Sequence, residues 1–295
     1  MRFMKAPLVS VLVTVFNREA YLAACVESIL NSTFDDIEVI IVDDASSDGS
    51  FELARSLASR DARIRLGRNE HNLGDYRNRS RAADLATGKY LKYVDSDDVI
   101  YRHSLGLMVE AMESFPDAAL GLSHSLPEAD EPYPWKLSPR DAWVKEFLGD
   151  GCLGCGPSGA IVRRDRFFEV GGFRTRGVLS DTDLWMRMSA RWPIVLLPPG
   201  LVWWRRHQGQ EYLRPDSHLT YLEGGFRLRM DALETLTPPL TENEIEKAKA
   251  RSRQHYARRL WSLAIYRSSP SVALRLLRQS GLGFADTMKG LRKYA

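Results

Sequence analysis

The first hundred residues alternate apolar, β-branched segments with segments of helical periodicity. Residues 8–16 (LVSVLVTVF) read as a strand, and Asn17 after them is a favoured helix N-cap. The same alternation recurs, so we expect strands at 8–16, 37–42, 64–66 and 90–94 and helices at 18–30, 50–59 and 74–86. Strands that alternate with helices through short connections predict an α/β fold, with a mostly parallel sheet flanked by helices on both faces.

The pattern changes twice beyond residue 100. Residues 117–150 are rich in proline and predict a long irregular excursion. After it we expect a strand at 159–163, a helix at 181–190 and a pair of strands at 194–197 and 201–204. Helical periodicity then predicts helices at 241–265, 270–280 and 285–293. We therefore expect an α/β domain over 1–212, with halves at 1–100 and 101–212, and a helical C-terminal appendage over 213–295.

Composition narrows the class of protein. Of the 295 residues, 44% are hydrophobic and 27% are charged, which is typical of a globular chain and excludes disorder. Three cysteines cannot build a disulfide framework, which favours a reducing, cytoplasmic compartment. No apolar run is long enough to span a membrane, and the N-terminus does not resemble a secretory signal.

The net charge of +3 is unevenly distributed. Residues 241–295 carry 12 Lys and Arg against 4 Asp and Glu, so the preceding residues have a net charge of −5. The basic segment 251–278 also carries Trp, Tyr and Leu, a pattern typical of a helix lying on a membrane surface. An amphipathic helix packed on the catalytic domain or on a second subunit would show the same pattern, and both alternatives stay open. A basic nucleic-acid-binding motif is absent, so no nucleic acid partner is expected.

Two acidic clusters follow strands and carry the chemistry. Asp95, Asp97 and Asp98 lie within four residues, and such carboxylates suit Mg²⁺ or Mn²⁺ together with a substrate phosphate. Asp43 and Asp44 end the second strand, where a carboxylate can accept from a nucleobase N–H or a ribose hydroxyl. Solvated turns and helix capping are the alternatives. Because both clusters follow strand ends, they can line one crevice.

The order of motifs resembles one family. VSVLVTVFNREAYLAACVESIL, EVIIVDDASSDGS and NLGDYRNRSRAADLATGKYLKYVDSDD resemble the N-terminal half of the family-two glycosyltransferases, which have the GT-A (Rossmann-like) fold. GPSGAIVRRDRFFEVGGF and WWRRHQGQ resemble later elements of that family, although its usual Glu-Asp pair is Ser180-Asp181 in this chain. The resemblance covers residues 8–210 and implies a nucleotide-binding half followed by an acceptor-binding half.

The resemblance also implies site residues. The nucleotide-binding positions would be Thr14, Phe16, Asn17, Asp43, Asp44, Arg77, Asp95 and Ser96. Asp97 and His207 would hold the metal, and Asp98 and Arg206 would meet the donor sugar and its diphosphate. Asp181 would be the catalytic base, with Asp183 near the acceptor. From their place in the proline-rich excursion, Trp135 and Trp143 are candidate platforms for an acceptor sugar, with a core position as the alternative.

The implied activity is that of an inverting, metal-dependent glycosyltransferase. It would move a sugar from a nucleoside-diphosphate sugar, with UDP favoured, to a hydroxyl of a glycan or lipid-linked acceptor in polysaccharide, glycolipid or glycoprotein glycan assembly. The inner face of the cell membrane is an alternative location to the cytoplasm. Two other functions stay open. A non-catalytic nucleotide- or glycan-binding module would explain the Ser at position 180, and a nucleotidyltransferase would need a glycine-rich N-terminal loop that residues 8–18 lack.

Overall fold

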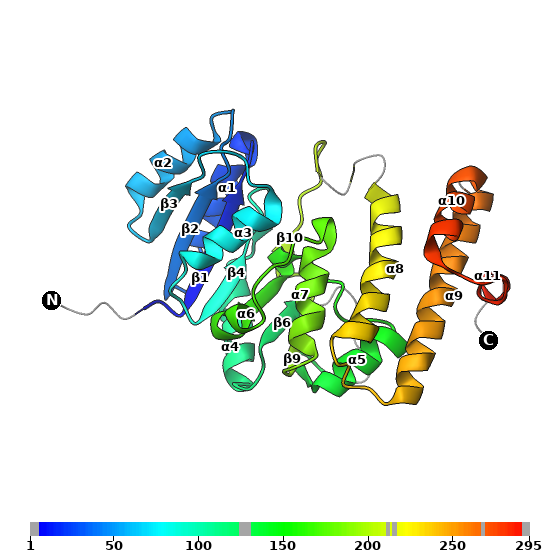
Figure 1. Ribbon diagram of the computed structural model, residues 1–295. Coiled ribbons are helices and arrows are strands. Elements are labelled where there is room, and N and C mark those ends of the chain that lie inside the picture. The colour runs from blue at the N-terminus through cyan, green and yellow to red at the C-terminus, as the bar shows by residue number, and fades with distance from the viewer. Residues whose placement is uncertain (1–5, 124–130, 211–212, 214–216, 267–268, 291–295) are drawn as a thin grey trace. The chain divides into compact units, whose positions relative to one another are not determined.

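The computed structural model describes residues 6–123, 131–210, 213, 217–266 and 269–290 (Figure 1). The chain divides into two compact units, each considered by itself below. Unit 1 consists of Met1–Ala142 and Cys152–Arg206, and unit 2 of Trp143–Gly151 and His207–Ala295. Residue 212, the expected domain boundary, lies outside the described residues.

Unit 1 is built on a sheet whose strands run in the order β3-β2-β1-β4-β8-β6-β9-β7. The parallel first half contains β1 (Val9–Val15), β2 (Ile37–Asp43), β3 (Ile64–Arg68) and β4 (Tyr90–Tyr93). The second half contains β6 (Leu120–Ser123), β7 (Trp135–Leu137), β8 (Ala160–Arg163) and β9 (Ile194–Leu197). There β8 is antiparallel to β4 and β6, and β6 is parallel to β9. The expected mostly parallel sheet is confirmed.

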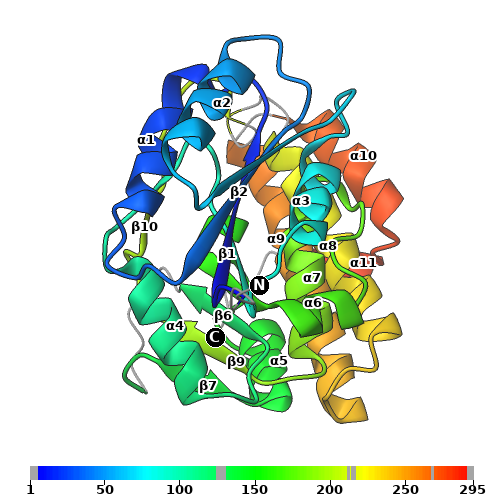
Figure 2. The ribbon, with the colours of Figure 1, turned by 90° about the vertical axis from the view of Figure 1, so that its left-hand side faces the viewer.

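Helices cover both faces of this sheet. Figure 2 shows α1 (Glu19–Leu30), α2 (Ser50–Arg60) and α4 (Ser104–Ser114) on one side, and α3 (Asp75–Asp84), α6 (Arg164–Glu169) and α7 (Ser180–Ser189) on the other. The central strand β1 shows why both faces need a cover. Val9, Val11 and Val13 join the core with α1 and α4, while Leu12 on the opposite face is equally buried. A strand buried on both faces reads as a continuous apolar run, as residues 8–16 do.

Two expectations about residues 117–204 are wrong. The excursion at 117–150 is not irregular throughout, because it contains β6, β7 and α5 (Pro139–Leu148). The segments 194–197 and 201–204 do not pair with each other: β9 pairs with β6 and β7, and β10 (Val202–Trp203) pairs antiparallel with β5 (Val99–Ile100). Each of the two strands has its partner far away in the sequence, β6 for β9 and β5 for β10, so the local pattern could not show these pairings.

Unit 2 is helical. It contains the end of α5, α8 (Ser217–Thr235), α9 (Glu242–Tyr266), α10 (Pro270–Ser280) and α11 (Phe284–Lys289). The expected helices 241–265 and 270–280 match α9 and α10, and α8 was not expected. The third expected helix, 285–293, is α11, and its residues 291–293 lie outside the described part of the chain. Pro270 in the first turn of α10 and Gly281 after it, at φ 68°, are favoured helix-end residues.

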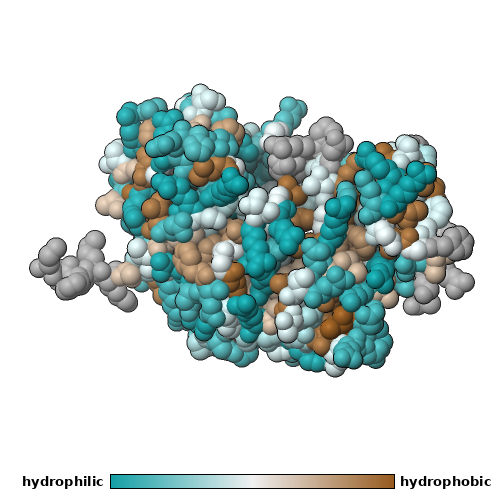
Figure 3. All heavy atoms as spheres, viewed as in Figure 1, coloured by the Kyte–Doolittle hydropathy of each residue, from teal (hydrophilic) through white to brown (hydrophobic). Residues whose placement is uncertain are grey.

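The apolar side of α9 is buried within unit 2. Tyr256, Leu260 and Leu263 form a core with residues of α10, against which Phe226 of α8 packs. No helix among the described residues is long and apolar enough to cross a membrane. The face shown in Figure 3 is mainly hydrophilic, with apolar side chains in separate groups. On that face no continuous apolar band is visible.

Candidate functional site

The sheet brings the two acidic clusters to one edge. Val15 at the end of β1 is the register partner of Asp43 on β2, and Leu12 is the partner of Tyr93 on β4. The residues after these strands therefore share the carboxyl edge of the parallel half. A crevice outside the carboxyl ends of the strands is where α/β sheets bind ligands.

The turn after β1 is locked to the turn after β2. Asn17 adopts a left-handed φ of 52°; its N–H donates to Ser46 Oγ at 3.0 Å, and its Oδ1 accepts from the Ser47 N–H at 2.9 Å. Ala45 also has a positive φ of 58°. Left-handed conformations of non-glycine residues persist only where their surroundings impose them, which is common at ligand sites. Beside this turn Thr14 is half-buried and Phe16 is exposed.

Asp43 and Asp44 are both buried, and they differ in their partners. Asp44 accepts from Asn69 Nδ2 at 2.7 Å and from the Leu73 and Gly74 N–H groups at 2.9 and 3.0 Å. Its carboxylate thus holds the loop 69–74, and a nucleobase would compete with these donors. Asp43 Oδ2 accepts from the Ser46 N–H, while Asp43 Oδ1 is buried without a hydrogen-bond partner in the described part of the chain. The orphaned oxygen on Asp43 is the one that calls for a further donor.

Three arginines contact the acidic loop after β4, two of them through ion pairs. Asp97 Oδ2 lies 2.9 Å from Arg18 Nε, and Asp95 Oδ1 lies 2.8 Å from Arg79 Nη1. Asp98 accepts from the backbone N–H of Arg205 at 3.2 Å, and Arg205 Nε donates to the Asp97 carbonyl. Burial, and then the nearby negative charge of Asp95, raise the pKa of Asp98 to about 7. The loop therefore concentrates negative charge that needs cations.

Ser158 holds the backbone at the start of this loop. The Asp95 N–H donates to Ser158 Oγ at 2.9 Å, and Ser96 is buried. Lys92 on β4 is fully buried, with Nζ donating to the Ser158 and Tyr93 carbonyls, and burial lowers its pKa to about 8. A buried lysine was not anticipated, and in the strand sequence KYLKYV it looks like an outward-facing residue.

Arg79, not the expected Arg77, reaches the acidic loop. Arg77 is exposed on α3, whereas Arg79 is buried and pairs with both Asp75 and Asp95. The nucleotide-binding role expected of Arg77 stays a prediction, and Arg79 is a further candidate because of its two ion pairs.

Arg205 and Arg18 are further functional candidates that the sequence analysis missed. Arg205 lies over the rings of Tyr21 and Trp203, at 5.3 and 4.6 Å from their centroids. The neighbouring Arg206 is exposed over Trp204. His207 belongs to unit 2, where its Nδ1 lies 2.7 Å from the Gln208 carbonyl. The expected roles of Arg206 and His207 stay predictions.

Asp181 lies in the first turn of α7 and is close enough to Arg79 and Asp95 to feel their charges. Burial raises its pKa to about 6, while the Thr182 N–H at 2.6 Å and the charge of Arg79 partly stabilise the anion. Ser180, where the family has an acid, accepts from the Arg176 N–H and donates to the Gly177 carbonyl. That serine closes the turn before α7.

The acceptor candidates divide into buried and accessible side chains. Asp183 forms a buried ion pair with Arg187 at 2.7 Å, and Arg187 also holds the carbonyls of Val170 and Gly172. Trp143 is fully buried in unit 2 and stacks on Phe147. The side chains of Asp183 and Trp143 therefore have structural roles, and neither presents an exposed surface to a sugar. Trp135, on β7, is half-buried.

The acidic loop offers oxygen ligands, which is the type that a hard divalent cation binds. Asp95 and Asp97 supply carboxylate oxygens. Both carboxylates already bind positively charged groups, the guanidinium groups of Arg79 and Arg18. In the described part of the chain, no group of three or more His, Cys, Asp or Glu side chains is arranged to hold a metal ion. The protein would therefore supply only part of the coordination, and phosphate oxygens of a substrate would complete it, as is usual for Mg²⁺.

Comparison with known proteins identifies the family. Residues 10–171 match Glycosyl transferase family 2, which is more than half of the chain, and the chain belongs to this family. Glycosyltransferase GlyG of Streptococcus pneumoniae is 32% identical over 141 residues, 48% of this chain and 47% of GlyG. The uncharacterized protein MT1568 of Mycobacterium tuberculosis is 27% identical over 268 residues, 83% of this chain and 80% of that protein. The match thus spans about half of GlyG.

Solved structures agree with the fold. S. aureus TarS 1–349 in complex with UDP-GlcNAc has a TM-score of 0.65 at 16% identity, over 96% of this chain and 78% of TarS. Mannosyltransferase PcManGT from Pyrobaculum calidifontis, in complex with GDP-Man and Mn²⁺, has a TM-score of 0.63 at 17% identity, over 96% of this chain and 79% of that one. At such identities the likeness concerns the fold alone, and it confirms the GT-A-like architecture.

Proposed function

We propose that this chain transfers a sugar from a nucleoside-diphosphate sugar to a hydroxyl group of a glycan or lipid-linked acceptor, with inversion at the anomeric carbon. The observation that carries the proposal is the carboxyl edge of the sheet. There Asp43, with its orphaned oxygen, and the Asp95–Asp98 loop share one edge of the sheet, and Asp181, whose pKa is raised by burial, is close enough to Asp95 to feel its charge. The relatives named as glycosyltransferases, and the UDP-GlcNAc and GDP-Man complexes of the structural neighbours, support it.

The nucleotide would lie along the turns after β1 and β2. Thr14, Phe16 and Asn17 would line the base, and Asp43 Oδ1 would accept a hydrogen bond from it. Arg79 would orient Asp95 toward the ribose. We favour UDP, in line with the ligands of TarS.

Asp95 and Asp97 would hold Mn²⁺ or Mg²⁺, with the diphosphate as the other ligand. A bound divalent ion stabilises the charge that develops on the leaving diphosphate. Arg205, beside the same loop, places a fixed positive charge where that anion would lie, and Asp98 keeps its backbone in position.

Asp181 would take the proton of the acceptor hydroxyl. A base of pKa about 6 is ionised at neutral pH and binds a proton more strongly than an exposed aspartate does. One base and one displacement invert the anomeric centre, so an α-linked donor would give a β-linked product. We place this work in the cytoplasm, where the free cysteines of the chain would stay reduced.

The test is incubation with a panel of sugar nucleotides, Mn²⁺ and a crude glycan or lipid-linked acceptor pool, followed by detection of free nucleoside diphosphate. NMR of the product then gives the anomeric configuration. Inversion, and loss of transfer in Asp181→Asn, are expected. Retention would contradict the role of Asp181. Nucleotide binding with neither transfer nor donor hydrolysis would favour a binding module, and pyrophosphate release from a nucleoside triphosphate would indicate a nucleotidyltransferase.

A further inference from the structure

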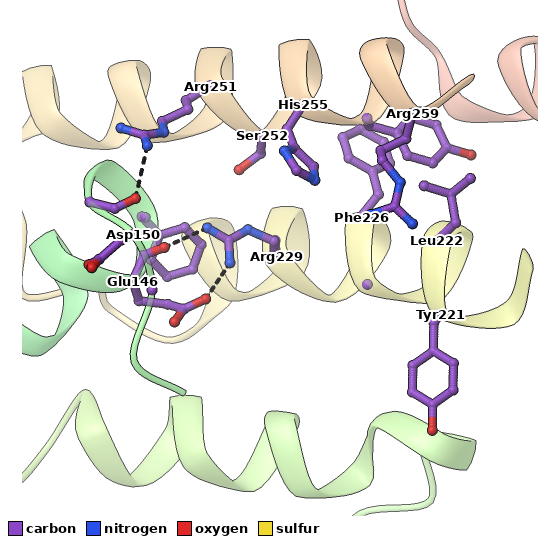
Figure 4. A pocket seen from close by; sticks show the side chains of 15 residues that line it. Glu146, Asp150, Tyr221, Leu222, Phe226, Arg229, Arg251, Ser252, His255 and Arg259 are labelled. Atoms are coloured by element: carbon purple, nitrogen blue, oxygen red, sulfur yellow. Dashed lines mark hydrogen bonds and ion pairs between the residues drawn. The ribbon is translucent and has the colours of Figure 1, made fainter. Parts of the chain in front are cut away.

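Unit 2 contains a cavity whose lining residues all belong to that unit. This cavity, of about 480 Å³ and open to solvent on one side, is lined by the end of α5, by α8 and by α9 (Figure 4). Ser252, His255 and Arg259 recur along α9 at helical spacing, so they share one face of that helix. Figure 4 shows the side chains of His255 and Arg259 projecting from α9 toward α8. The chemistry of this cavity is independent of the acidic loop and does not rest on the function proposed above.

A buried hydroxyl in the cavity wall lacks an acceptor. Ser252 is 5% exposed, and its Oγ forms no hydrogen bond within the described part of the chain. Burying a hydroxyl without a partner is unfavourable, and buried polar groups in proteins are nearly always paired. An unpaired hydroxyl that lines a cavity is therefore a donor available to a ligand.

Positive charge is in excess around this hydroxyl. The two acidic side chains of the wall are engaged, Glu146 with Arg229 and Asp150 with Lys145 at 2.9 Å. Arg259, in contrast, makes no hydrogen bond or ion pair with any residue that the structure describes. Burial, and then the charges of several arginines headed by Arg259, lower the pKa of His255. Arg259, whose side chain is also exposed to solvent, is thus a cationic donor at this cavity without a matching anion among the described residues, and the exposed imidazole of His255 lies one turn before it on α9.

The rest of the wall is aromatic and firmly packed. Phe226 of α8 and Tyr256 of α9 stack with their ring centroids 4.3 Å apart, and the Arg229 guanidinium lies 4.4 Å from the ring centroid of Phe147. Arg251 donates to the carbonyls of Leu148 and Gly149, which fixes the end of α5 against α9. These contacts fix the aromatic rings and the end of α5 in the cavity wall.

We propose that this cavity binds a phosphate-bearing ligand, whose oxygens are met by Arg259 and His255 and accept a hydrogen bond from Ser252 Oγ. A phosphate group offers several acceptor oxygens and negative charge, and arginine pairs with it strongly. The volume exceeds what inorganic phosphate fills, so the ligand carries a further group, such as a sugar or a lipid headgroup, against the aromatic wall.

The test uses inorganic pyrophosphate as the probe and the ring signal of His255 as the local reporter. The chain has six histidines, so the signal is assigned by its loss in His255→Gln. In the full chain, titration should shift it in a saturable manner. Arg259→Gln should weaken half-saturation about tenfold, and Ser252→Ala about threefold to fivefold, as losing a charged or a neutral donor predicts. Arg275→Gln, an exposed arginine of α10 that does not line the cavity, removes the same charge and should change nothing.

Vesicles separate the two sources of phosphate. If the natural ligand is a lipid headgroup, the chain should co-sediment with vesicles of phosphatidylcholine and phosphatidic acid, and Arg259→Gln should reduce this while Arg275→Gln does not. Pyrophosphate binding with no difference between these two variants on vesicles would point to a soluble phosphate ester. A His255 signal that does not saturate, or equal weakening by Arg259→Gln and Arg275→Gln, would overturn the proposal.

Discussion

Arg18 Nε lies 2.9 Å from Asp97 Oδ2, although the two residues are 79 positions apart in the sequence. The same guanidinium donates to the carbonyls of Phe16 and Asn17. Arg18 thereby ties the turn after β1 to the acidic loop after β4, the two segments that we propose meet the nucleotide and the metal. The side chain of Asp97 is 12% exposed, so this ion pair is largely shielded from solvent on the Asp97 side.

Replacing Arg18 should make the thermal stability of the chain depend more strongly on the metal ion. Arg18→Met keeps the apolar stem and removes the Arg18–Asp97 ion pair, which should cost about 1–3 kcal/mol of stability in EDTA. A divalent ion would then bind at Asp97 without competition from the Arg18 guanidinium. The rise in Tm on adding Mn²⁺ should therefore be larger in Arg18→Met than in the unaltered chain, as measured by differential scanning fluorimetry. Equal rises would show that Asp97 does not hold the metal.

Arg79 and Arg77, both on α3, allow a matched pair of variants to be compared. Arg79→Gln leaves Asp95 without its ion-pair partner, which should cost about 2–3 kcal/mol, since Asp95 is partly exposed and the loss lies below that of a fully buried pair. Nucleotide affinity should fall with it. Arg77→Gln removes the same charge from an exposed position and should change stability by no more than about 0.5 kcal/mol. Urea unfolding and nucleotide titration of both variants measure these differences, and similar losses in the two would contradict a distinct role for Arg79.

Asp181 should link stability and activity to pH in opposite directions. Its pKa in the folded state, about 6, exceeds its ordinary value of 3.8. Between these two pH values the folded state therefore binds more protons than the unfolded state. Stability contributed by the protonated group is present below pH 4 and is lost as pH rises through 6. Asp181→Asn should therefore raise stability at pH 7.5 by at most about 2–3 kcal/mol, and by little at pH 4.

The pH dependence of activity that Asp181 causes should have the opposite sign to its effect on stability. Because the base must be ionised, kcat/KM should rise with pH through about 6 in the unaltered chain. Asp181→Asn should lower kcat by a factor of about 10²–10⁴. A variant that is neither more stable at pH 7.5 nor less active would refute the base assignment.

Much of the fold follows from local pattern. Strands β1 and β2 are long, apolar and bounded by polar turns, and α10 begins at a proline and ends before a glycine, so each was predicted within about two residues. Strand β7 has three residues and lies after a run of prolines, which gives no periodicity to read. The pairing of β10 with β5 joins residues about a hundred positions apart, and local sequence holds no information on it.

The site was predictable as a set of loops, less so in its individual contacts. The ends of the expected strands are enough to locate Asp43 and Asp95–Asp98 at one edge of the sheet. Which aspartate keeps an orphaned oxygen, or which arginine turns inward, depends on tertiary packing. Asp183 looked like an acceptor contact because the sequence does not show that Arg187 would hold it.

The most direct test of the account is a thermal-shift panel of UDP, GDP, dTDP and CMP, each with Mn²⁺ and with EDTA, on the unaltered chain and on Asp97→Ala. A ligand at 100 times its Kd adds about 2.7 kcal/mol of stability, which is readily measured. We predict that one nucleoside diphosphate, UDP, stabilises the chain only with Mn²⁺ and that Asp97→Ala abolishes the effect. If no nucleotide stabilises the chain under either condition, the carboxyl edge is not a nucleotide-sugar site and the central claim is wrong.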